Sequence, residues 1–370
     1  MFHVIPDIFR SGIAFAVVLG VLVFVHEFGH YLAARWCGVH VEVFSIGFGQ
    51  AITSWMDRRG TRWKVAWLPL GGYVKMHGQE RPEEVSPQVR ASWIPGRTFH
   101  EKKVWQRAII VAAGPIANFL LAMVLFGLLF ASMGMPVTLP VVGGVLPGTA
   151  AANAGLQVND RIDAIAGQPV HDFTDIQRII EARPDQVLPI AITRNGAAST
   201  FEVHTGSQES DGQRVGMLGI RGGPVEYRHL PIGVALWAGV QQTWTVTKET
   251  VQGIAQMISG ARGTQDLGGP LRIAQLSGQV AELGLASLVS FIAVLSVNLG
   301  LINLFPIPVL DGGHLLFYAA EAARGRPLPA KALEYGFRAG LAVLASLFIF
   351  ATWNDLSNIG LFHWMAHLMG

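Results

Sequence analysis

Two histidines and a glutamate occur within five residues of the segment VFVHEFGHYLAARW, residues 23–36, inside an otherwise apolar stretch. His26 and His30 are four residues apart, so a helix would place them one above the other on the same face. Two imidazoles at that spacing can bind one zinc ion, which lowers the pKa of a bound water to near 7. Glu27 could take a proton from that water and later pass it to a leaving amine. The pattern therefore indicates zinc-assisted hydrolysis.

The surroundings of this motif favour a metal over ordinary packing. An ionisable side chain at the centre of a membrane helix costs ~2.5–3.5 kcal/mol on insertion scales, and three occur together here. A buried polar network without metal is the alternative. Catalytic zinc usually has three protein ligands and an open fourth position. In the metzincin group of soluble zinc proteases, an extension of the same motif supplies the third ligand as a histidine at the position of Trp36. This chain lacks that histidine, so the third ligand lies elsewhere.

The segment NLFPIPVLDGGH, residues 303–314, supplies a candidate third ligand in Asp311. Two prolines before the aspartate and two glycines after it predict a broken helix. Irregular backbone at membrane depth is tolerated only where it lines a cavity or is buried in protein. Asp311 could instead cap a helix that starts at the next residue. His314 could support the ligand, or be an ordinary cap or turn residue.

The composition is that of a polytopic membrane protein with some soluble mass. Of 370 residues, 51% are apolar and 14% are charged. The single cysteine, Cys37, excludes an intrachain disulfide and a cysteine-rich metal cluster. The net charge of +2 says little, but no polybasic or aromatic-interleaved stretch indicates nucleic acid as a partner. No cleavable signal peptide is expected.

Four apolar segments are long enough to cross a bilayer, at about 12–37, 108–135, 285–305 and 335–353. His26 lies thirteen residues after Ile13, which is about 20 Å along a helix. That distance is about two-thirds of the way across the hydrocarbon core. Asp311 follows the end of the third segment at the same side of the membrane. The two depths agree, which favours a single site.

Lysine and arginine indicate the orientation in the membrane. Loop 38–107 holds eleven of them and loop 306–338 holds four, whereas the segment 136–284 holds ten against thirteen acidic residues. Because cytoplasmic loops carry the excess of positive charge, we expect 38–107 and 306–338 in the cytoplasm. Both termini and 136–284 are then extracytoplasmic.

These motifs together resemble the site-2 protease family of intramembrane zinc metalloproteases, in particular its branch of bacterial regulators of sigma-E proteases. The segments that carry the resemblance are HEFGH (26–30), FSIGFG (44–49), PLGGYVKM (69–76), GPIANFLLA (114–122) and NLFPIPVLDGG (303–313). The resemblance implies that His26, His30 and Asp311 bind Zn²⁺ and that Glu27 is the catalytic base. It also implies that Asn303 contacts the substrate backbone near the scissile bond, although Asn303 could simply satisfy a kinked helix.

The family places GGYVKM in a membrane-associated β-element. The segment WKVAWLPLGGYVKM, residues 63–76, mixes β-branched and aromatic residues around two glycines, as in a hairpin or a paired edge. An exposed edge can add a strand from the substrate and hold it extended, so that its peptide bonds are accessible. The residues expected to bind substrate in this way are Gly72, Tyr73, Val74, Lys75 and Met76. An ordinary soluble hairpin is the alternative.

Residues 136–225 resemble one PDZ domain, through VVGGVLPGTAAANAGLQVNDRIDAIAGQPV (141–170) and the helix-like DFTDIQRIIEA (172–182). Well-known members of this branch carry two such domains, and only one fits here. The domain could exclude bulky ectodomains, or it could hold a partner without gating. Residues 226–284 are expected to form an amphipathic helical connector, although plain packing fits equally well.

The expected fold is an α-helical polytopic membrane protein with four transmembrane helices, a membrane-associated β-element and one inserted extracytoplasmic PDZ (α+β) domain. Its segments are 1–37 (first transmembrane helix), 38–107 (cytoplasmic or membrane-associated β-region), 108–135 (second helix), 136–225 (PDZ domain), 226–284 (connector), 285–353 (third and fourth helices) and 354–370 (interfacial tail). His363 and His367 of the tail lack a neighbouring carboxylate, so no second metal site is expected.

The predicted activity is cleavage of single-span membrane proteins within the bacterial inner membrane. By resemblance, an upstream site-1 protease would first shorten the substrate, and anti-sigma factors or remnant signal peptides would be cut in regulated intramembrane proteolysis. A catalytically silent PDZ scaffold and a metal transporter are the alternatives. Glu27 beside the ligands argues against the scaffold, and the lack of a second intramembrane ligand set argues against the transporter.

Overall fold

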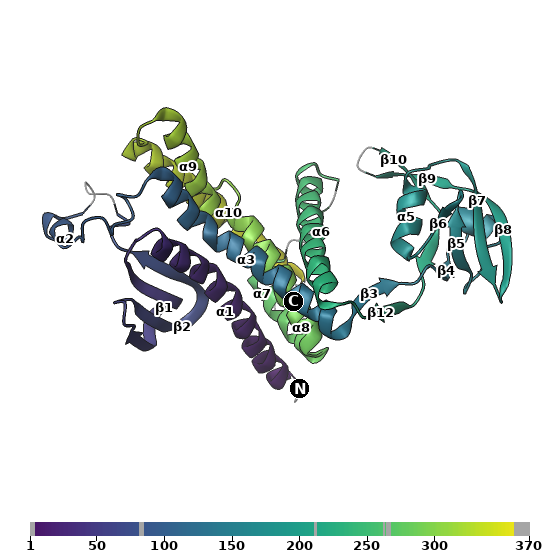
Figure 1. Cartoon of the computed structure of the whole chain (residues 1–370), viewed down its shortest axis with the longest axis horizontal. Helices are drawn as coiled ribbons and strands as arrows, with labels where there is room; N and C mark the ends of the chain where they lie inside the picture. Colours follow the sequence, from purple (N-terminus) through teal and green to yellow (C-terminus); the bar gives the residue numbers. More distant parts are fainter. Residues whose placement is uncertain (1–3, 81–84, 211–212, 262, 264–267, 359–370) are drawn as a thin grey trace, which may run out of the picture. The chain divides into compact units, whose positions relative to one another are not determined.

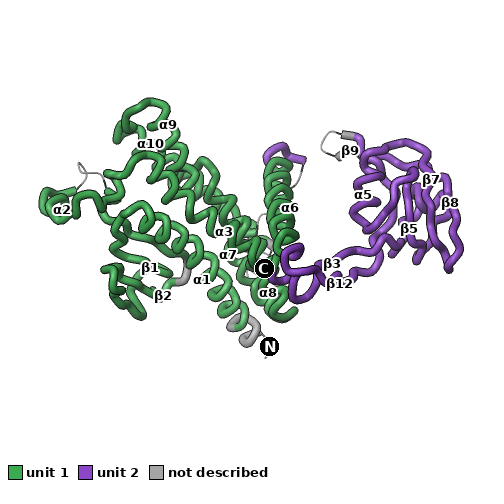
Figure 2. The backbone as a smooth tube through the Cα atoms, in the orientation of Figure 1, with its two compact units in different colours: residues 1–127, 236–257, 262–370 green, residues 128–235, 258–261 purple. Residues whose placement is uncertain are grey.

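The computed structural model describes residues 4–80, 85–210, 213–261, 263 and 268–358. The chain divides into two compact units (Figure 2). Unit 1 comprises residues 1–127, 236–257 and 262–370, and unit 2 comprises residues 128–235 and 258–261. In the sequence, unit 2 is therefore inserted into unit 1, between its second and third apolar segments.

Unit 1 consists mainly of long helices (Figure 1). Within the described residues, four helices are long and apolar enough to cross a membrane. They are α1 (Val4–Trp36), α3 (Val104–Met133), α8 (Leu285–Asn303) and α10 (Ala330–Asn358). These helices correspond to the four predicted spans, so the protein is a multi-pass membrane protein. Of the predicted tail, residues 359–370, with His363 and His367, lie outside the described part of the chain.

The first two apolar helices approach closely because small residues line their contact. A Cβ atom added to Gly29 of α1 would overlap the backbone of Ala113 on α3. A Cβ atom on Gly300 of α8 would lie 3.1 Å from the carbonyl oxygen of Pro115. Small residues at such crossings let helix backbones meet within a membrane. Glycine therefore sets the distance from α3 to α1 and to α8 at these two crossings.

The β-region of unit 1 forms one sheet from β1 (Val41–Met56) and β2 (Arg62–Met76). Each long strand contributes two segments. Residues 43–46 pair with 62–65 on one side and with 72–75 on the other, and residues 51–56 pair with 62–66. The order across the sheet is therefore 51–56, 62–66, 41–46, 72–76. Residues 72–76 form an outer edge of this sheet within the described chain. Of the two arrangements expected for residues 63–76, the paired edge is formed and the hairpin is not, because two halves of β2 flank one segment of β1.

The chain between α8 and α9 (Asp311–Arg324) is irregular, as the two prolines and two glycines predict. Val309 has φ of +132°, a conformation that strains a β-branched residue. Cβ atoms added to Gly312 and Gly313 would overlap carbonyl oxygens of Leu304 and Ile307. The first turn of α9 therefore lies directly against the preceding loop. Its N-cap residue is Leu310, so Asp311 is not the helix cap.

Two further helices, α6 (Ile232–Ile258) and α7 (Pro270–Glu282), occupy the predicted connector. Thr250 of α6 donates a hydrogen bond of 2.9 Å to the side-chain oxygen of Asn298 on α8. The buried carboxylate of Asp355 on α10 accepts hydrogen bonds from backbone N–H groups at the start of α7, at 2.8–3.1 Å. Both helices are therefore held by specific contacts to the apolar helices.

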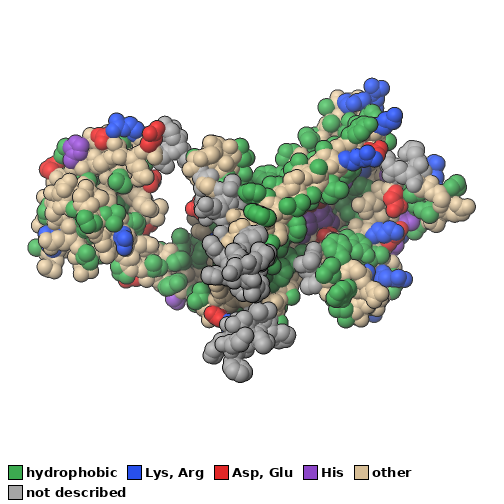
Figure 3. Space-filling model, turned by 180° about the vertical axis from the view of Figure 1, so that it is seen from behind, with side chains coloured by type: hydrophobic (Ala, Val, Ile, Leu, Met, Phe, Trp, Pro, Cys, Tyr) green, Lys and Arg blue, Asp and Glu red, His purple; other side chains and the backbone are tan. Residues whose placement is uncertain are grey.

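Apolar and charged side chains are segregated on unit 1. Figure 3 shows hydrophobic side chains along its long helices and a group of lysine and arginine side chains near the end formed by α9 and α10. The exposed basic residues of that end include Arg324, Arg326, Lys331 and Arg338. This distribution suits helices that pass through an apolar phase and end in water.

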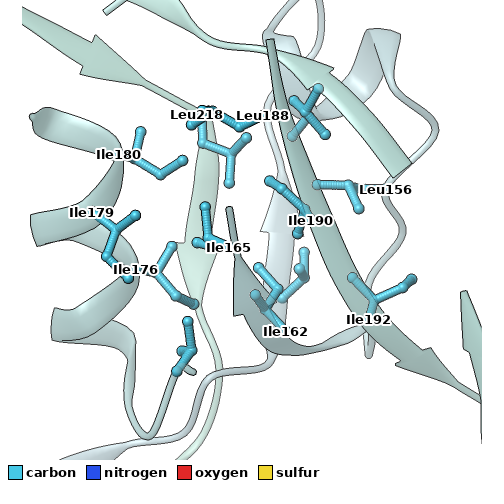
Figure 4. Close-up of a cluster of buried hydrophobic side chains, with 14 residues drawn as sticks. Leu156, Ile162, Ile165, Ile176, Ile179, Ile180, Leu188, Ile190, Ile192 and Leu218 are labelled. Carbon is cyan, nitrogen blue, oxygen red and sulfur yellow. The ribbon is translucent and has the colours of Figure 1, made fainter. Parts of the chain in front are cut away.

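Unit 2 is built on a four-stranded antiparallel sheet with the order β6-β5-β7-β8, and its described residues also form three two-stranded pairs. Its elements are β3 (Met135–Thr138), β4 (Val142–Val145), α4 (Ala150–Asn153), β5 (Arg161–Ile165), β6 (Gln168–Pro169), α5 (Phe173–Glu181), β7 (Val187–Arg194), β8 (Ala197–His204), β9 (Gly206–Ser210), β10 (Gln213–Met217), β11 (Ile220–Gly222) and β12 (Val225–Arg228). Helix α5 turns Ile176, Ile179 and Ile180 toward the sheet, where they meet Ile165 and Ile190 (Figure 4).

A buried carboxylate fixes the start of β5 in unit 2. Asp160 is fully buried and accepts hydrogen bonds from Nε and Nη2 of Arg194 at 2.6 and 2.7 Å. The backbone N–H of Gln157 donates a third, at 2.7 Å. Burial alone would raise the pKa of Asp160, but the bonds from Arg194 and Gln157 hold that pKa below its usual value.

We expect Asp160→Asn to lower the stability of unit 2 by about 1.5–3 kcal/mol, because a charge-assisted pair is lost. In the wild-type protein this contribution is fully present above about pH 3.9, the usual pKa of an unfolded aspartate, and disappears as the pH falls through the lower folded pKa. Hydrogen exchange of β5 and β7 between pH 3 and pH 7 would measure both effects. Asp185→Asn, which removes the partner of Arg214 in an exposed pair, should change little. Equal effects of the two substitutions would contradict the prediction.

Candidate functional site

The two histidines of α1 and the aspartate that opens α9 meet at one point in unit 1. Nε2 of His26 and Nε2 of His30 are 3.3 Å apart. Oδ2 of Asp311 lies 3.2 Å from the first nitrogen and 3.4 Å from the second. Both histidines are buried, and Asp311 is mostly buried. The structure thus brings together the three residues that the sequence predicts as ligands.

The other ring nitrogen of each histidine faces a protein group that can fix its tautomer. Nδ1 of His30 lies 2.9 Å from the backbone carbonyl of Ile110 on α3, which can only accept a hydrogen bond. His30 therefore donates from Nδ1, and its Nε2 keeps a lone pair. Nδ1 of His26 lies 3.2 Å from the side-chain amide of Asn118. If the amide presents its oxygen, His26 also donates from Nδ1 and keeps the Nε2 lone pair.

These atoms fit a metal ion better than a hydrogen-bond network. Oδ2 of Asp311 is buried without a hydrogen-bond partner, and so is Oδ1 of Asn118. Turning the Asn118 amide would satisfy its oxygen with the N–H of His26. Three electron-pair donors then face one another at 3.2–3.4 Å with no proton between them. Two imidazoles and one carboxylate are a typical ligand set for catalytic zinc.

The candidate ligands lie in the wall of a cavity of about 770 Å³ within unit 1. The same wall includes Glu27, Asn303 and four of the five predicted strand residues, namely Gly72, Tyr73, Val74 and Met76. Lys75 does not line the cavity, because its ammonium group pairs with Glu42 at 2.9 Å. The pKa of Lys75 is raised by this hydrogen bond. The charged end of Lys75 therefore faces Glu42 and does not contribute to the cavity wall.

The edge of the sheet lies directly against Glu27. A Cβ atom added to Gly72 would be 3.0 Å from Cγ of Glu27 and 2.7 Å from Cγ1 of Val23. Only glycine therefore lets the outer strand approach α1 at this level. The side chain of Glu27 and the backbone of the edge strand consequently lie next to each other in the cavity wall.

A helix that carries an HExxH pair and buries it against a carboxylate from a second segment is the arrangement of a zinc peptidase. The sequence of this chain matches the family model of Peptidase family M50 over residues 14–347. This chain belongs to that family, the site-2 protease family. It is a zinc metalloprotease, and the family resemblance seen in the sequence is confirmed.

Curated relatives match over nearly the whole chain. A protein of Rhizobium meliloti that is named as a zinc metalloprotease is 43% identical in an alignment of 369 positions, which covers 93% of this chain and 95% of the relative. A similarly named protein of Agrobacterium fabrum is 42% identical over 94% of this chain and 96% of its own length. Metalloprotease MmpA of Caulobacter vibrioides is 37% identical over 95% of this chain and 96% of its own length.

Residues of α3 complete the site, and the sequence reasoning did not single them out. Gly114 lies against His30, since a Cβ atom there would overlap the imidazole. Asn118 contacts His26, and the hydroxyl of Ser296 on α8 donates to the backbone carbonyl of Asn118 at 2.8 Å. The signal was present in GPIANF, which places a glycine and an asparagine four residues apart in an apolar helix. An uncharged polar residue at that depth needs a partner.

We expect Asn118→Leu to weaken zinc binding by about 10–100-fold, because the group that holds the tautomer of His26 is lost. Competition with a chelator on the purified protein would measure the dissociation constant. Asn118→Asp keeps an oxygen acceptor at the same place and should bind zinc far more tightly than the leucine variant. Wild-type affinity in Asn118→Leu would show that Asn118 has no such role.

Proposed function

We propose that this protein hydrolyses peptide bonds of single-span membrane proteins inside the bilayer, with His26, His30 and Asp311 as zinc ligands and Glu27 as the catalytic base. One observation carries the proposal. Two imidazole nitrogens and an orphaned carboxylate oxygen converge beside a glutamate, in a cavity walled by apolar helices. Such a constellation has a clear use in hydrolysis and no evident use in packing.

Zinc bound at this site would acidify a water molecule and polarise the scissile carbonyl. Glu27 would accept a proton from water as the water oxygen bonds to the scissile carbonyl carbon, and would transfer that proton to the nitrogen of the leaving amine as the C–N bond breaks. The side chain of Glu27 is placed for this task by α1, whose next turn carries His30. Gly114 and Ile110 keep His30 in position through packing and a hydrogen bond.

The outer strand of the sheet, residues 72–76, would bind the substrate as an added strand. The N–H of Met76 turns away from its neighbour strand and bonds to the side chain of Gln79 at 3.4 Å. Because N–H direction alternates along a strand, Val74 and Gly72 point their N–H groups to the same outer side. These groups can hold an unwound substrate segment next to Glu27. Asn303 would bind the substrate backbone, since it lines the cavity and its side chain makes no hydrogen bond to another described residue.

Unit 2 would serve as a single PDZ-like domain outside the cytoplasm, in agreement with its helix packed on an antiparallel sheet. In this proposal it admits substrates that an upstream site-1 protease has already shortened, as in regulated intramembrane proteolysis. Anti-sigma factors and remnant signal peptides are the expected substrates. The expected location is the bacterial inner membrane, with both termini and unit 2 on the extracytoplasmic side, because basic residues concentrate in 38–107 and 306–338.

Glu27→Gln should keep zinc and the fold but reduce cleavage by about 10²–10⁴-fold, because the amide cannot accept the proton of water. The measurement is cleavage of a model transmembrane peptide in detergent, with zinc quantified in the same preparation. His26→Ala is the contrasting variant and should lose zinc together with activity. If Glu27→Gln cleaves the peptide at the wild-type rate, Glu27 is not the base.

Val74→Pro should abolish cleavage without loss of zinc, because it removes an outward N–H from the edge strand. Proline is tolerated at such a position, where no bond of the sheet is broken. Val74→Ala is the matched control, since it keeps the N–H while it removes buried apolar contacts. We expect the alanine variant to cleave and the proline variant not to cleave the same peptide. The opposite order, or normal cleavage by both, would exclude strand addition at this edge.

A further inference from the structure

His314 lies on the wall of the same cavity as Glu27 and the three candidate ligands. It follows Asp311 by three residues on α9, so the two side chains leave the helix on the same face. Its ring packs between Phe337, at 5.3 Å between ring centroids, and Tyr318, at 6.4 Å. These two neighbours hold the imidazole within the cavity.

The ring nitrogens of His314 make no hydrogen bond to another described residue. Its backbone N–H bonds to the carbonyl of Leu310, but its side chain makes no bond to Asp311 that would mark it as support for a ligand. Burial lowers the pKa of His314, so the ring is neutral near pH 7 and carries one N–H. The side chain is thus an oriented donor without a partner in the described structure.

Hydrolysis of a peptide bond places negative charge on the former carbonyl oxygen. In a site shielded from water, a hydrogen-bond donor aimed at that oxygen accelerates the reaction. Arg107 of the cavity wall is already paired with Glu321 at 2.7 Å and stacked on Tyr318 at 5.0 Å, so it is committed elsewhere. Glu27 is an acceptor in its active form. His314, by contrast, is a neutral donor in the wall that also holds the candidate zinc ligands.

We propose that His314 is a catalytic residue, whose imidazole N–H donates a hydrogen bond to the oxygen of the tetrahedral carbon during peptide hydrolysis. This role rests on the proposed peptidase reaction of the same site. No proton is transferred by His314, because the donor only stabilises charge that develops on oxygen. Phe337 and Tyr318 orient the ring, which reduces the reorganisation needed when that charge appears.

The test compares His314→Leu, which removes the donor but can still pack on Phe337, with His314→Gln, which restores an N–H. We expect the leucine variant to lose about 10²–10³-fold in kcat for a model transmembrane peptide, with KM and zinc content close to wild type. Its affinity for a phosphinic peptide, whose tetrahedral anion mimics the transition state, should fall in parallel with kcat/KM. The glutamine variant should regain part of both losses.

His100→Leu is the matched control, because it removes another histidine of the cavity wall, one whose ring nitrogen bonds to the carbonyl of Gly78 at 2.9 Å. It should leave kcat and phosphinate binding close to wild type. Wild-type kcat in His314→Leu would overturn the inference. Loss of zinc in that variant would overturn it too, because His314 would then act by supporting the ligand Asp311. A wild-type protein that binds zinc but does not cleave the peptide would instead refute the proposed function itself.

Discussion

Three electron-pair donors held within 3.4 Å of one another, inside unit 1, are the constraint on which the site depends. Without a cation, the buried carboxylate of Asp311 would face two nitrogen lone pairs and no donor. That arrangement is unfavourable in a medium that solvates charge poorly. A divalent ion bound there, as proposed, would remove the conflict, because it would neutralise the carboxylate and use all three lone pairs. Metal binding and correct assembly of α1, α3 and α9 would then be coupled.

The backbone must come unusually close for the three donors to converge. Gly29 and Gly114 let α1 and α3 approach until the ring of His30 reaches the carbonyl of Ile110. Gly312 and Gly313 let α9 begin directly against the loop that follows α8. A methyl group at any of these positions would overlap a neighbouring atom. The apolar helices thus provide rigidity, and the glycines set the distances at which the chemistry can occur.

The sequence predicted the parts of the site that depend on local spacing. The pair His26 and His30 follows from helical periodicity, and Asp311 follows from the prolines and glycines around it. Asn118 was missed as a site residue. GPIANF marks it as a polar residue that needs a partner, but which partner it finds depends on which face of α3 meets α1. For residues 63–76 the sequence left a hairpin and a paired edge open, and only the structure distinguishes them. Two halves of β2 flank one segment of β1, and this register depends on pairing between distant residues.

A membrane substrate is helical, yet its peptide bond must be exposed to be cut, and the position of Gly72 bears on how both conditions can be met. A peptide bond in a helix is protected by hydrogen bonds, whereas hydrolysis needs an exposed carbonyl next to a base. An edge strand can replace the lost helical bonds of an unwound segment, but only if it reaches the base. Gly72 allows this, because its missing side chain leaves room for Cγ of Glu27 directly beneath the strand. In the proposed reaction, unwinding and positioning therefore occur in one step, and the backbone contacts that stabilise the extended substrate also align its carbonyl with the catalytic carboxylate.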